Sequence, residues 1–290
     1  MNKVSFIGGD RRQQIAASLM HDTGFSVTTY GVFHPQEEYR NGFISSSLAA
    51  ALDQSQYIVL PVPYRNKDGY VPCGSEVVSP SWQEVYDGMA PGSTLIMGLS
   101  DPELYASCAK KDIRVRDFIE EGLYAEWNCI PTSEGALRIL MQELPITIHE
   151  SHMLVTGYGR IAKRLAANLR DLGCYVSIAA RNPAARKAAR ASGIMAYSID
   201  ELTHAVKGQD AILNTVPAVL IDTDIIAHIT PNTLLVELAS APWGIDFTAA
   251  ANAGLRVINA PGLPGKEAPV TSGRVLAKTF ANFIQEESYQ

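Results

Sequence analysis

The residues of this chain best suited to chemistry lie in a glycine-containing segment near its middle. An apolar stretch over residues 152–156 runs into Gly157-Tyr158-Gly159-Arg160-Ile161-Ala162 and then an alanine-rich stretch over residues 163–169. One glycine allows a tight turn, the next lets the backbone approach a pyrophosphate, and Ala162 permits close packing of a helix on a strand. The helix would offer N–H groups and a partial positive charge to phosphates. We therefore predict a dinucleotide-binding turn, and the alternative is a purely structural turn. The predicted cofactor contacts of this turn are Gly157, Tyr158, Gly159, Arg160 and Ile161.

The next apolar stretch indicates which dinucleotide is bound. An NAD site usually has Asp or Glu about 20 residues past the glycines, where it holds the ribose 2′-hydroxyl. No acidic residue occurs between Cys174 and Pro183, and Arg181-Asn182 follows the stretch instead. A guanidinium can bind a 2′-phosphate through two hydrogen bonds. Residues 156–190 hold eight basic residues and one acidic residue in a chain of net charge −6. These features favour NADP over NAD, although some of the cations could simply be solvated.

Later segments supply further candidate cofactor contacts. Asn214-Thr215-Val216-Pro217 follows a predicted strand, at a place where a dinucleotide fold passes the nicotinamide ribose. A proline-ended turn is the alternative interpretation. Residues 237–246 follow the next long strand, and small residues there, such as Ala239, would permit close approach of a flat ring. We expect Thr215, Val216, Pro217 and Ala239 to contact the cofactor.

Two cations stand where a carboxylate ligand could be bound. Arg11 begins a predicted helix after Gly8-Gly9-Asp10, and Lys266 follows a Pro- and Gly-rich stretch over residues 259–265. A helix N-terminus beside arginines suits a carboxylate, but either cation could equally be solvated. Glu134 could act as a base or orient another group, and its position near the start of a predicted helix also suits a capping-box glutamate.

The candidate cofactor contacts must be positioned by strands and helices that alternate regularly along the second half of the chain. Alternation of strands and helices predicts a parallel, doubly wound sheet with ligands beyond the carboxyl ends of its strands. The predicted strands are 152–156, 174–179, 194–197, 210–214, 233–238 and 255–258, and the predicted helices are 160–172, 184–192, 199–207, 222–229 and 246–253.

The first 130 residues predict a smaller, flavodoxin-like α/β domain. Residues 61–93 are rich in Pro, Gly and Ser and are expected to form a loop, and a helix from Thr132 should end at Pro145. The last helix, 270–286, is expected to return to the first domain. We therefore predict an α/β protein with two Rossmann-like domains, a substrate-side domain of residues 1–130 plus 266–290 and an NADP-binding domain of residues 131–265. The predicted strands of the first domain are 3–7, 25–30, 57–60, 94–97 and 113–116, with helices at 11–22, 101–110 and 118–127.

Composition excludes several classes of protein. The 290 residues are 47% hydrophobic, and no stretch is long and apolar enough to span a bilayer. The acidic balance argues against a nucleic-acid partner, and the unevenly spaced cysteines fit neither a disulfide framework nor a zinc site. His149-Glu150-Ser151-His152 is one residue short of a zinc-protease motif. We expect a cytoplasmic, oligomeric protein without a metal.

Taken together and in order, these segments resemble the A-subunit family of bacterial dipicolinate synthase. The resemblance covers nearly the whole chain, and three departures stand out: Trp243 where a glycine is expected, Glu237 where Asp is common, and Glu267 where the family tends to be apolar. Of these, Trp243 could narrow the nicotinamide pocket. The segments that carry the resemblance are residues 8–13, 60–63, 130–136, 157–160, 180–181, 214–217, 237–240 and 260–266.

The resemblance implies a reaction and a partner. The substrate would be a cyclic dicarboxylate, dihydrodipicolinate or its 4-hydroxy-tetrahydro form, which NADP⁺ oxidises to pyridine-2,6-dicarboxylate during sporulation. Carboxylate binding would fall to Arg11 and Lys266, and Glu134 is the candidate base. A second subunit that resembles flavoproteins is also implied. Two alternatives stay open: an NADP oxidoreductase of the shikimate or methylenetetrahydrofolate dehydrogenase type, and a non-catalytic NADP-binding subunit that regulates a partner.

Overall fold

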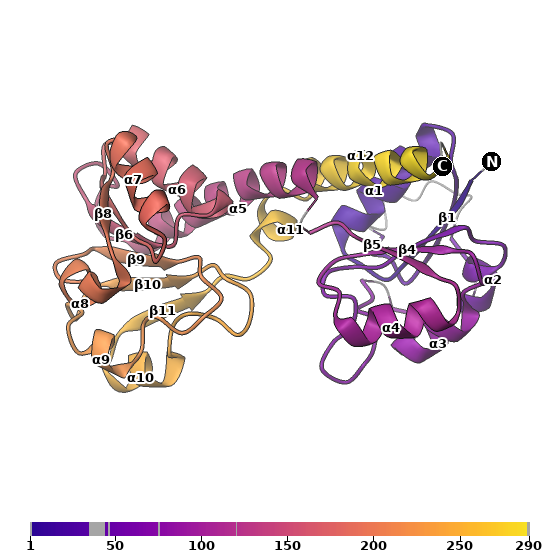
Figure 1. Ribbon diagram of the computed structural model, residues 1–290, viewed down its shortest axis with the longest axis horizontal. Coiled ribbons are helices and arrows are strands. Elements are labelled where there is room, and N and C mark those ends of the chain that lie inside the picture. Colours follow the sequence, from indigo (N-terminus) through magenta and orange to yellow (C-terminus); the bar gives the residue numbers. More distant parts are fainter. Residues whose placement is uncertain (1, 35–43, 46, 75, 120, 289–290) are drawn as a thin grey trace. The chain divides into compact units, whose positions relative to one another are not determined.

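The protein is built from two compact units. The computed structural model describes residues 2–34, 44–45, 47–74, 76–119 and 121–288. The first unit, here called the terminal unit, comprises Met1–Asn128 and Ala268–Gln290, and the central unit comprises Cys129–Glu267 (Figure 1). Within these residues, each unit contains one β-sheet, and all paired strands are parallel. The predicted α/β class with two parallel sheets is therefore confirmed.

The terminal unit has a five-stranded sheet in the order β2-β1-β3-β4-β5, which is the flavodoxin-like order. Its central strands are short, mostly apolar runs that are buried on both faces because helices cover both. The strands are β1 (Lys3–Ile7), β2 (Ser26–Tyr30), β3 (Tyr57–Val59), β4 (Thr94–Met97) and β5 (Arg114–Asp117).

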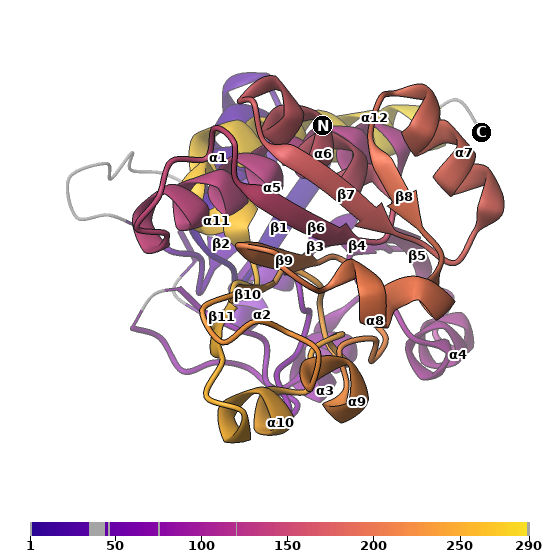
Figure 2. The same cartoon turned by 90° about the vertical axis from the view of Figure 1, so that its left-hand side faces the viewer.

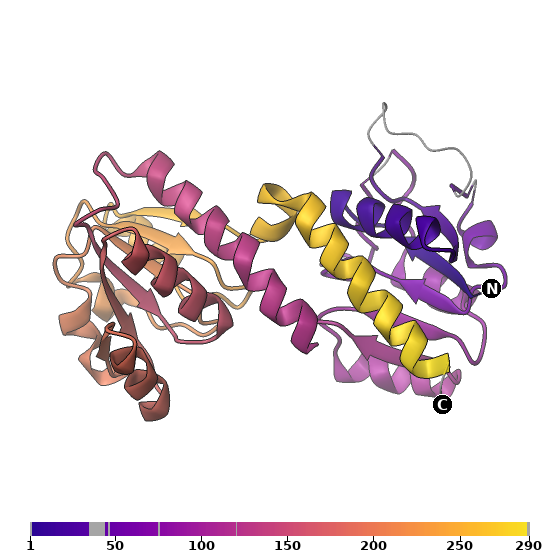
Figure 3. The same cartoon turned by 90° about the horizontal axis from the view of Figure 1, so that it is seen from above.

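In the terminal unit, a helix near the amino end of the chain packs against the helix at its carboxyl end. The helices α1 (Arg11–Asp22) and α12 (Pro269–Ser288) lie side by side (Figure 3). A Cβ on Gly273 would lie 2.7 Å from Ile15 Cβ, so only glycine allows this approach. Further along α12, the ring of Phe280 packs against Phe6 and Phe118, with ring centroids 6.1 Å and 5.2 Å apart. The carboxyl-terminal helix thus completes the core of the first sheet.

Part of the predicted loop at residues 61–93 is helical. Helix α3 (Trp82–Gly88) begins with a capping box in which Ser81 and Glu84 each accept a hydrogen bond from the other's backbone. The ring of Trp82 packs edge-on against Tyr64, 5.4 Å between centroids. Composition concealed this helix because its flanks are rich in turn residues. The other helices of this unit are α2 (Leu48–Leu52), which the sequence did not predict, and α4 (Pro102–Lys110).

The two helices predicted on either side of residue 130 are a single helix. Helix α5 (Gly122–Glu143) runs through Pro131, and the boundary between the units falls inside it. Thr132 does not begin a helix, so a capping box with Glu134 is ruled out. Instead, Ser133 is fully buried and its hydroxyl accepts a hydrogen bond from Asn168 at 2.9 Å. Packing against the central unit therefore outweighs the cost of an interior proline.

The central unit has a six-stranded sheet in the order β11-β10-β9-β6-β7-β8. This is the strand order of dinucleotide-binding domains, and its direction of winding reverses between β6 and β9. The strands are β6 (His152–Thr156), β7 (Tyr175–Ala179), β8 (Met195–Tyr197), β9 (Ala211–Asn214), β10 (Leu234–Glu237) and β11 (Arg256–Asn259).

Helices cover the two faces of this sheet unequally (Figure 2). On one face, α5, α6 (Arg160–Asp171) and α7 (Pro183–Ala191) enclose a core that includes Leu165, Leu169 and Ile178. On the other face, the two helices predicted at residues 199–207 and 222–229 are shorter than expected. The elements of that face are a 3₁₀ turn η1 (Ile199–Glu201), α8 (Leu202–Ala205), α9 (Thr223–Ile226) and α10 (Phe247–Asn252), and α11 (Leu263–Glu267) ends the unit.

Within the part of the chain that the structure describes, no helix is long and apolar enough to cross a membrane.

Candidate functional site

The glycine turn after β6 lies at the carboxyl edge of the central sheet, beside the switch between β6 and β9. Gly157 has φ +89°, and its N–H donates to the carbonyl oxygen of Ala179 at 2.8 Å. A Cβ at this position would lie 2.8 Å from Thr215 Oγ1 and 2.9 Å from Val216 Cγ2. The turn therefore requires glycine for its conformation and for the approach of the neighbouring loop.

Gly159 has a different reason to be glycine. Its φ of −76° suits any residue, and a Cβ would meet no atom within 4 Å. It is the N-cap of α6, and this helix start has no side-chain capping bond, whereas the side chain of Asn182 caps α7 and that of Asp246 caps α10. An uncapped helix start with open space before it suits an anion. The flanking predicted contacts Tyr158, Arg160 and Ile161 are at least partly exposed.

Arg181 lies exposed just beyond the end of β7. Its backbone is fixed by Arg186, whose Nη1 donates to the carbonyl oxygens of Ala180 and Arg181, each at 2.8 Å. The side chain of Asn182 accepts from the N–H of Ala184 at 2.8 Å, so this predicted contact also has a structural task. The loop thus presents the guanidinium of Arg181 on a braced backbone.

The loop after β9 is held by a buried amide that the sequence analysis did not single out. Asn214 is fully buried, and its Oδ1 accepts from the N–H of Val216 at 3.2 Å while its Nδ2 donates to the Val216 carbonyl at 2.9 Å. The hydroxyl of Thr215 donates to the carbonyl oxygen of Thr156 at 2.7 Å. These bonds fix Thr215 and Val216 against the glycine turn, while Pro217 beyond them is exposed.

Glu237 is the second residue whose task the sequence did not indicate. It is fully buried at the end of β10 and accepts hydrogen bonds from Asn214 Nδ2 at 2.7 Å and from the N–H of Ala239 at 2.8 Å. The N–H groups of Gly244 and Ile245 also donate to it, at 2.8 and 3.0 Å. One carboxyl group therefore joins the loops after β9 and β10. An acidic residue ending a buried strand was the signal available in the sequence.

Trp243 stands in the loop that Glu237 holds. Its φ of +61° is in the left-handed region, which disfavours side chains with a Cβ. The ring packs edge-on against Phe247, 5.6 Å between centroids, and is 39% exposed. A bulky side chain is thus kept in a conformation typical of glycine, near the carboxyl edge of the sheet.

The three candidate catalytic residues fall in different units. Arg11 is exposed at the start of α1 in the terminal unit, where the neighbouring Arg12 pairs with Asp10 at 2.8 Å. Glu134 and Lys266 are exposed in the central unit, on α5 and α11.

Helices α5 and α11 are joined directly, which brings Glu134 and Lys266 into one region. Arg138 donates to both carboxylate oxygens of Glu267 at 2.7 Å. A Cβ on Gly135 would lie 2.8 Å from Glu267 Cγ. Among the described residues, no cluster of His, Cys, Asp or Glu could hold a metal ion.

The two parallel sheets and the glycine turn after β6 together define a class of protein. It is the class of two-unit α/β proteins with a nicotinamide-dinucleotide-binding domain of oxidoreductase type. Residues 147–260 match the family model of the acetohydroxy acid isomeroreductase NADPH-binding domain. The transhydrogenase of Sinorhizobium meliloti shares the fold over 98% of this chain and 94% of its own, with a TM-score of 0.67 at 16% identity.

Within this class, the similarity narrows to one family. Residues 3–119 match the model of the N-terminal domain of the dipicolinate synthase A-subunit. The dipicolinate synthase A-subunit of Bacillus subtilis (strain 168) is 30% identical over 288 residues, which are 98% of this chain and 96% of the relative. The crystal structure of the A-subunit from Bacillus halodurans, 26% identical, gives a TM-score of 0.88 over 97% of each chain. The chain belongs to the dipicolinate synthase A-subunit family.

Proposed function

We propose that this chain is the NADP-dependent oxidoreductase subunit of a dipicolinate synthase and acts during sporulation. The observation that carries the cofactor part of the proposal is the uncapped start of α6 behind Gly157 and Gly159, with Arg181 presented beyond the neighbouring strand. The pyrophosphate would lie at the helix start and a 2′-phosphate at Arg181. The absence of Asp and Glu between Cys174 and Pro183 supports NADP over NAD.

The loops after β9 and β10 suit the nicotinamide end of the cofactor. Thr215 and Val216 are fixed beside the glycine turn, and Ala239 is a small residue held by Glu237. Rigid loops at the carboxyl edge of the sheet would orient the ring without being reordered on binding. When bound, NADP⁺ supplies the hydride acceptor for the reaction.

The proposed substrate is dihydrodipicolinate or its 4-hydroxy-tetrahydro form. In the dihydro form, a ring carbon loses a hydride to the oxidised nicotinamide and the ring loses a proton, which gives pyridine-2,6-dicarboxylate. The hydroxylated form first loses water. Arg11 and Lys266 are the proposed carboxylate-binding cations, and Glu134 is the proposed proton acceptor. Their exposure supports these roles because each is accessible to a ligand.

The family name supports a further component. A relative whose name marks it as the A-subunit belongs to an enzyme with at least one other subunit, so we propose that this chain works with a second, flavoprotein-like subunit. An oligomeric assembly follows from this proposal.

A coupled assay tests the proposed function. The chain, with and without the second subunit, is mixed with pyruvate, aspartate semialdehyde, the aldol-type synthase that condenses them, and NADP⁺ or NAD⁺. Reduced nicotinamide and the ultraviolet band of dipicolinate should rise together, and faster with NADP⁺. Bound NADP without either signal in any mixture would contradict the oxidation and would instead favour a non-catalytic, regulatory subunit.

A further inference from the structure

One region of the central sheet is not covered by the described helices of its own unit. Strands β6 and β7 are joined through the 12-residue helix α6, but β8 and β9 are joined only through η1 and the four-residue α8. Leu202 and Ala205 of α8 pack in the same cluster as Ala179, at the carboxyl end of β7. Within the described residues, the amino-terminal half of that face is therefore left without a covering helix.

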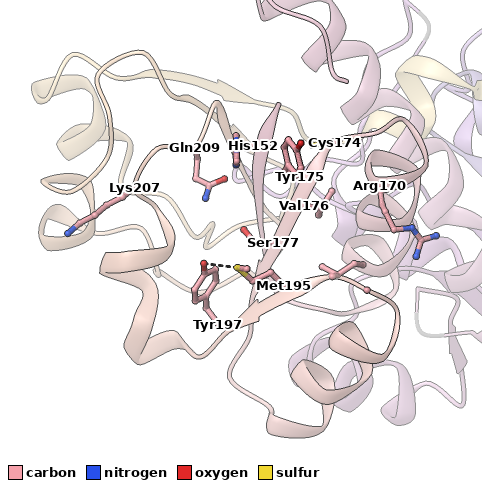
Figure 4. Close-up of a pocket in the computed structure, with 12 residues that line it drawn as sticks. His152, Arg170, Cys174, Tyr175, Val176, Ser177, Met195, Tyr197, Lys207 and Gln209 are labelled. Atoms are coloured by element: carbon pink, nitrogen blue, oxygen red, sulfur yellow. Dashed lines mark hydrogen bonds between the residues drawn. The ribbon is translucent and has the colours of Figure 1, made fainter. Parts of the chain in front are cut away.

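The strand register shows which side chains share this face. His152 pairs with Tyr175, and Ser177 pairs with Met195. Because side chains two apart on a strand point the same way, Tyr175, Ser177 and their partners lie on one face. Tyr175 is 57% exposed and Met195 is 60% exposed. Figure 4 shows these side chains around a hollow of about 510 Å³. We call this surface the amino-edge face; it comprises His152, Tyr175, Ser177, Met195, Tyr197 and Lys207.

The apolar side chains of the amino-edge face are held in place before any ligand binds. The rings of His152 and Tyr175 stack 4.9 Å apart between centroids. The hydroxyl of Tyr197 donates to the sulfur of Met195 at 2.9 Å (Figure 4). Tyrosine and methionine are enriched in protein interfaces, and preordered aromatic anchors lower the entropic cost of association.

The charges around the face indicate the character of its partner. The described residues lining the hollow include Arg170 and Lys207 but no Asp or Glu, and one adjoining carboxylate, that of Asp210, accepts a hydrogen bond from the N–H of His152 at 2.8 Å. Arg170 is paired with Asp171 at 2.7 Å, which leaves exposed Lys207 as the main positive charge at the rim. A partner that carries a carboxylate beside an apolar or aromatic side chain would complement this surface.

We propose that the amino-edge face binds the second subunit of the synthase. An acidic segment of that subunit would place an apolar or aromatic side chain on Met195 and Tyr175 and a carboxylate near Lys207. The two main contacts, Tyr175 and Met195, begin strands β7 and β8, whereas the glycine turn follows the carboxyl end of β6, so the complex leaves the cofactor turn open. This inference rests on the proposed function, which gives the chain a second subunit.

The test measures binding of the purified second subunit from the same organism to the full-length chain. Met195→Asp and the milder Tyr175→Ser should each lower its affinity by about tenfold or more. Met141→Asp is the matched control, because Met141 is a methionine of the same unit with 57% exposure. This control should bind like the unaltered chain. Lys207→Glu should weaken binding by a smaller factor, and added salt should narrow its difference from the unaltered chain.

Two further measurements separate the possible outcomes. Titration with NADP⁺ reports whether each variant keeps a folded central unit, and light scattering of the chain alone reports self-association. Unaltered affinity of Met195→Asp, or no complex with the unaltered chain, overturns the docking inference. Self-association of the chain that Met195→Asp abolishes also overturns it, because a second copy then occupies the face. NADP⁺ binding and turnover in the coupled assay decide the proposed function separately.

Discussion

At the scale of single residues, Arg181 is the residue that we propose selects NADP over NAD. It is presented by a backbone that Arg186 braces, and no carboxylate stands where an NAD site would need one. The first prediction is that Arg181→Ala weakens NADP⁺ binding by about 1.5–3 kcal/mol, the contribution of a hydrogen bond to a charged group, and NAD⁺ binding far less. Calorimetric titration measures both. Lys187→Ala, an exposed cation of α7, is the control, and equal loss for both cofactors would refute the 2′-phosphate role.

The two glycines of the turn should respond differently to substitution. A valine at Gly159 has space for its Cβ, so we expect a folded protein in which the side chain blocks the approach of the pyrophosphate. Alanine at Gly157 must adopt φ +89° and displace Thr215, so we expect loss of stability as well. Thermal unfolding and NADP⁺ titration of both variants provide the comparison. Unchanged NADP⁺ affinity in Gly159→Val would place the cofactor elsewhere.

Glu237 should contribute strongly to stability although it is not expected to touch the substrate. In Glu237→Gln, an amide N–H₂ would face N–H donors that now point at a carboxyl oxygen. Hydrogen bonds to charged groups contribute about 1.5–3 kcal/mol each, so we expect a loss of about 2–3 kcal/mol in the free energy of unfolding. Urea denaturation measures this loss. Glu201→Gln, at an exposed helix start, serves as the control; equal stability of the two variants would contradict the role of Glu237.

At the scale of elements, the packing of α1 on α12 depends on the absence of a side chain. Alanine normally favours a helix over glycine by about 1 kcal/mol, yet at Gly273 its Cβ would lie 2.7 Å from Ile15 Cβ and 2.9 Å from the backbone oxygen of Arg12. We expect Gly273→Ala to lower the free energy of unfolding by about 1–3 kcal/mol, as overpacking does. Gly122→Ala, where a Cβ meets no atom within 4 Å, should be neutral or stabilising. The urea concentration at half-unfolding should fall in Gly273→Ala and stay equal or rise in Gly122→Ala.

At the scale of the whole molecule, the two units have separate sheets and separate cores, so a cofactor held by one should protect that one. NADP⁺ at about 100 times its Kd should stabilise the unit that binds it by about 2.7 kcal/mol. We expect slower amide hydrogen exchange in the central unit, first in the segments around Gly157 and Thr215, and little change in β1 and β4 of the terminal unit. Protection confined to the terminal unit would contradict the assignment of the cofactor to the central one.

What the sequence determined by itself was local. Glycine spacing, the alternation of apolar runs and the absence of an acid after β7 depend on neighbouring residues, which is why the two parallel sheets and the glycine turn were predictable. Tertiary structure decided the features that depend on contacts between distant segments. Helix α5 continues through Pro131 because its far half packs on the central unit, and α3 begins where composition indicated only loop. Glu237 reaches Asn214, 23 residues away in sequence, and no local pattern records that bond. The amino-edge face is exposed because the short helix α8 covers only part of its side of the central sheet, and this too is visible only in the folded chain.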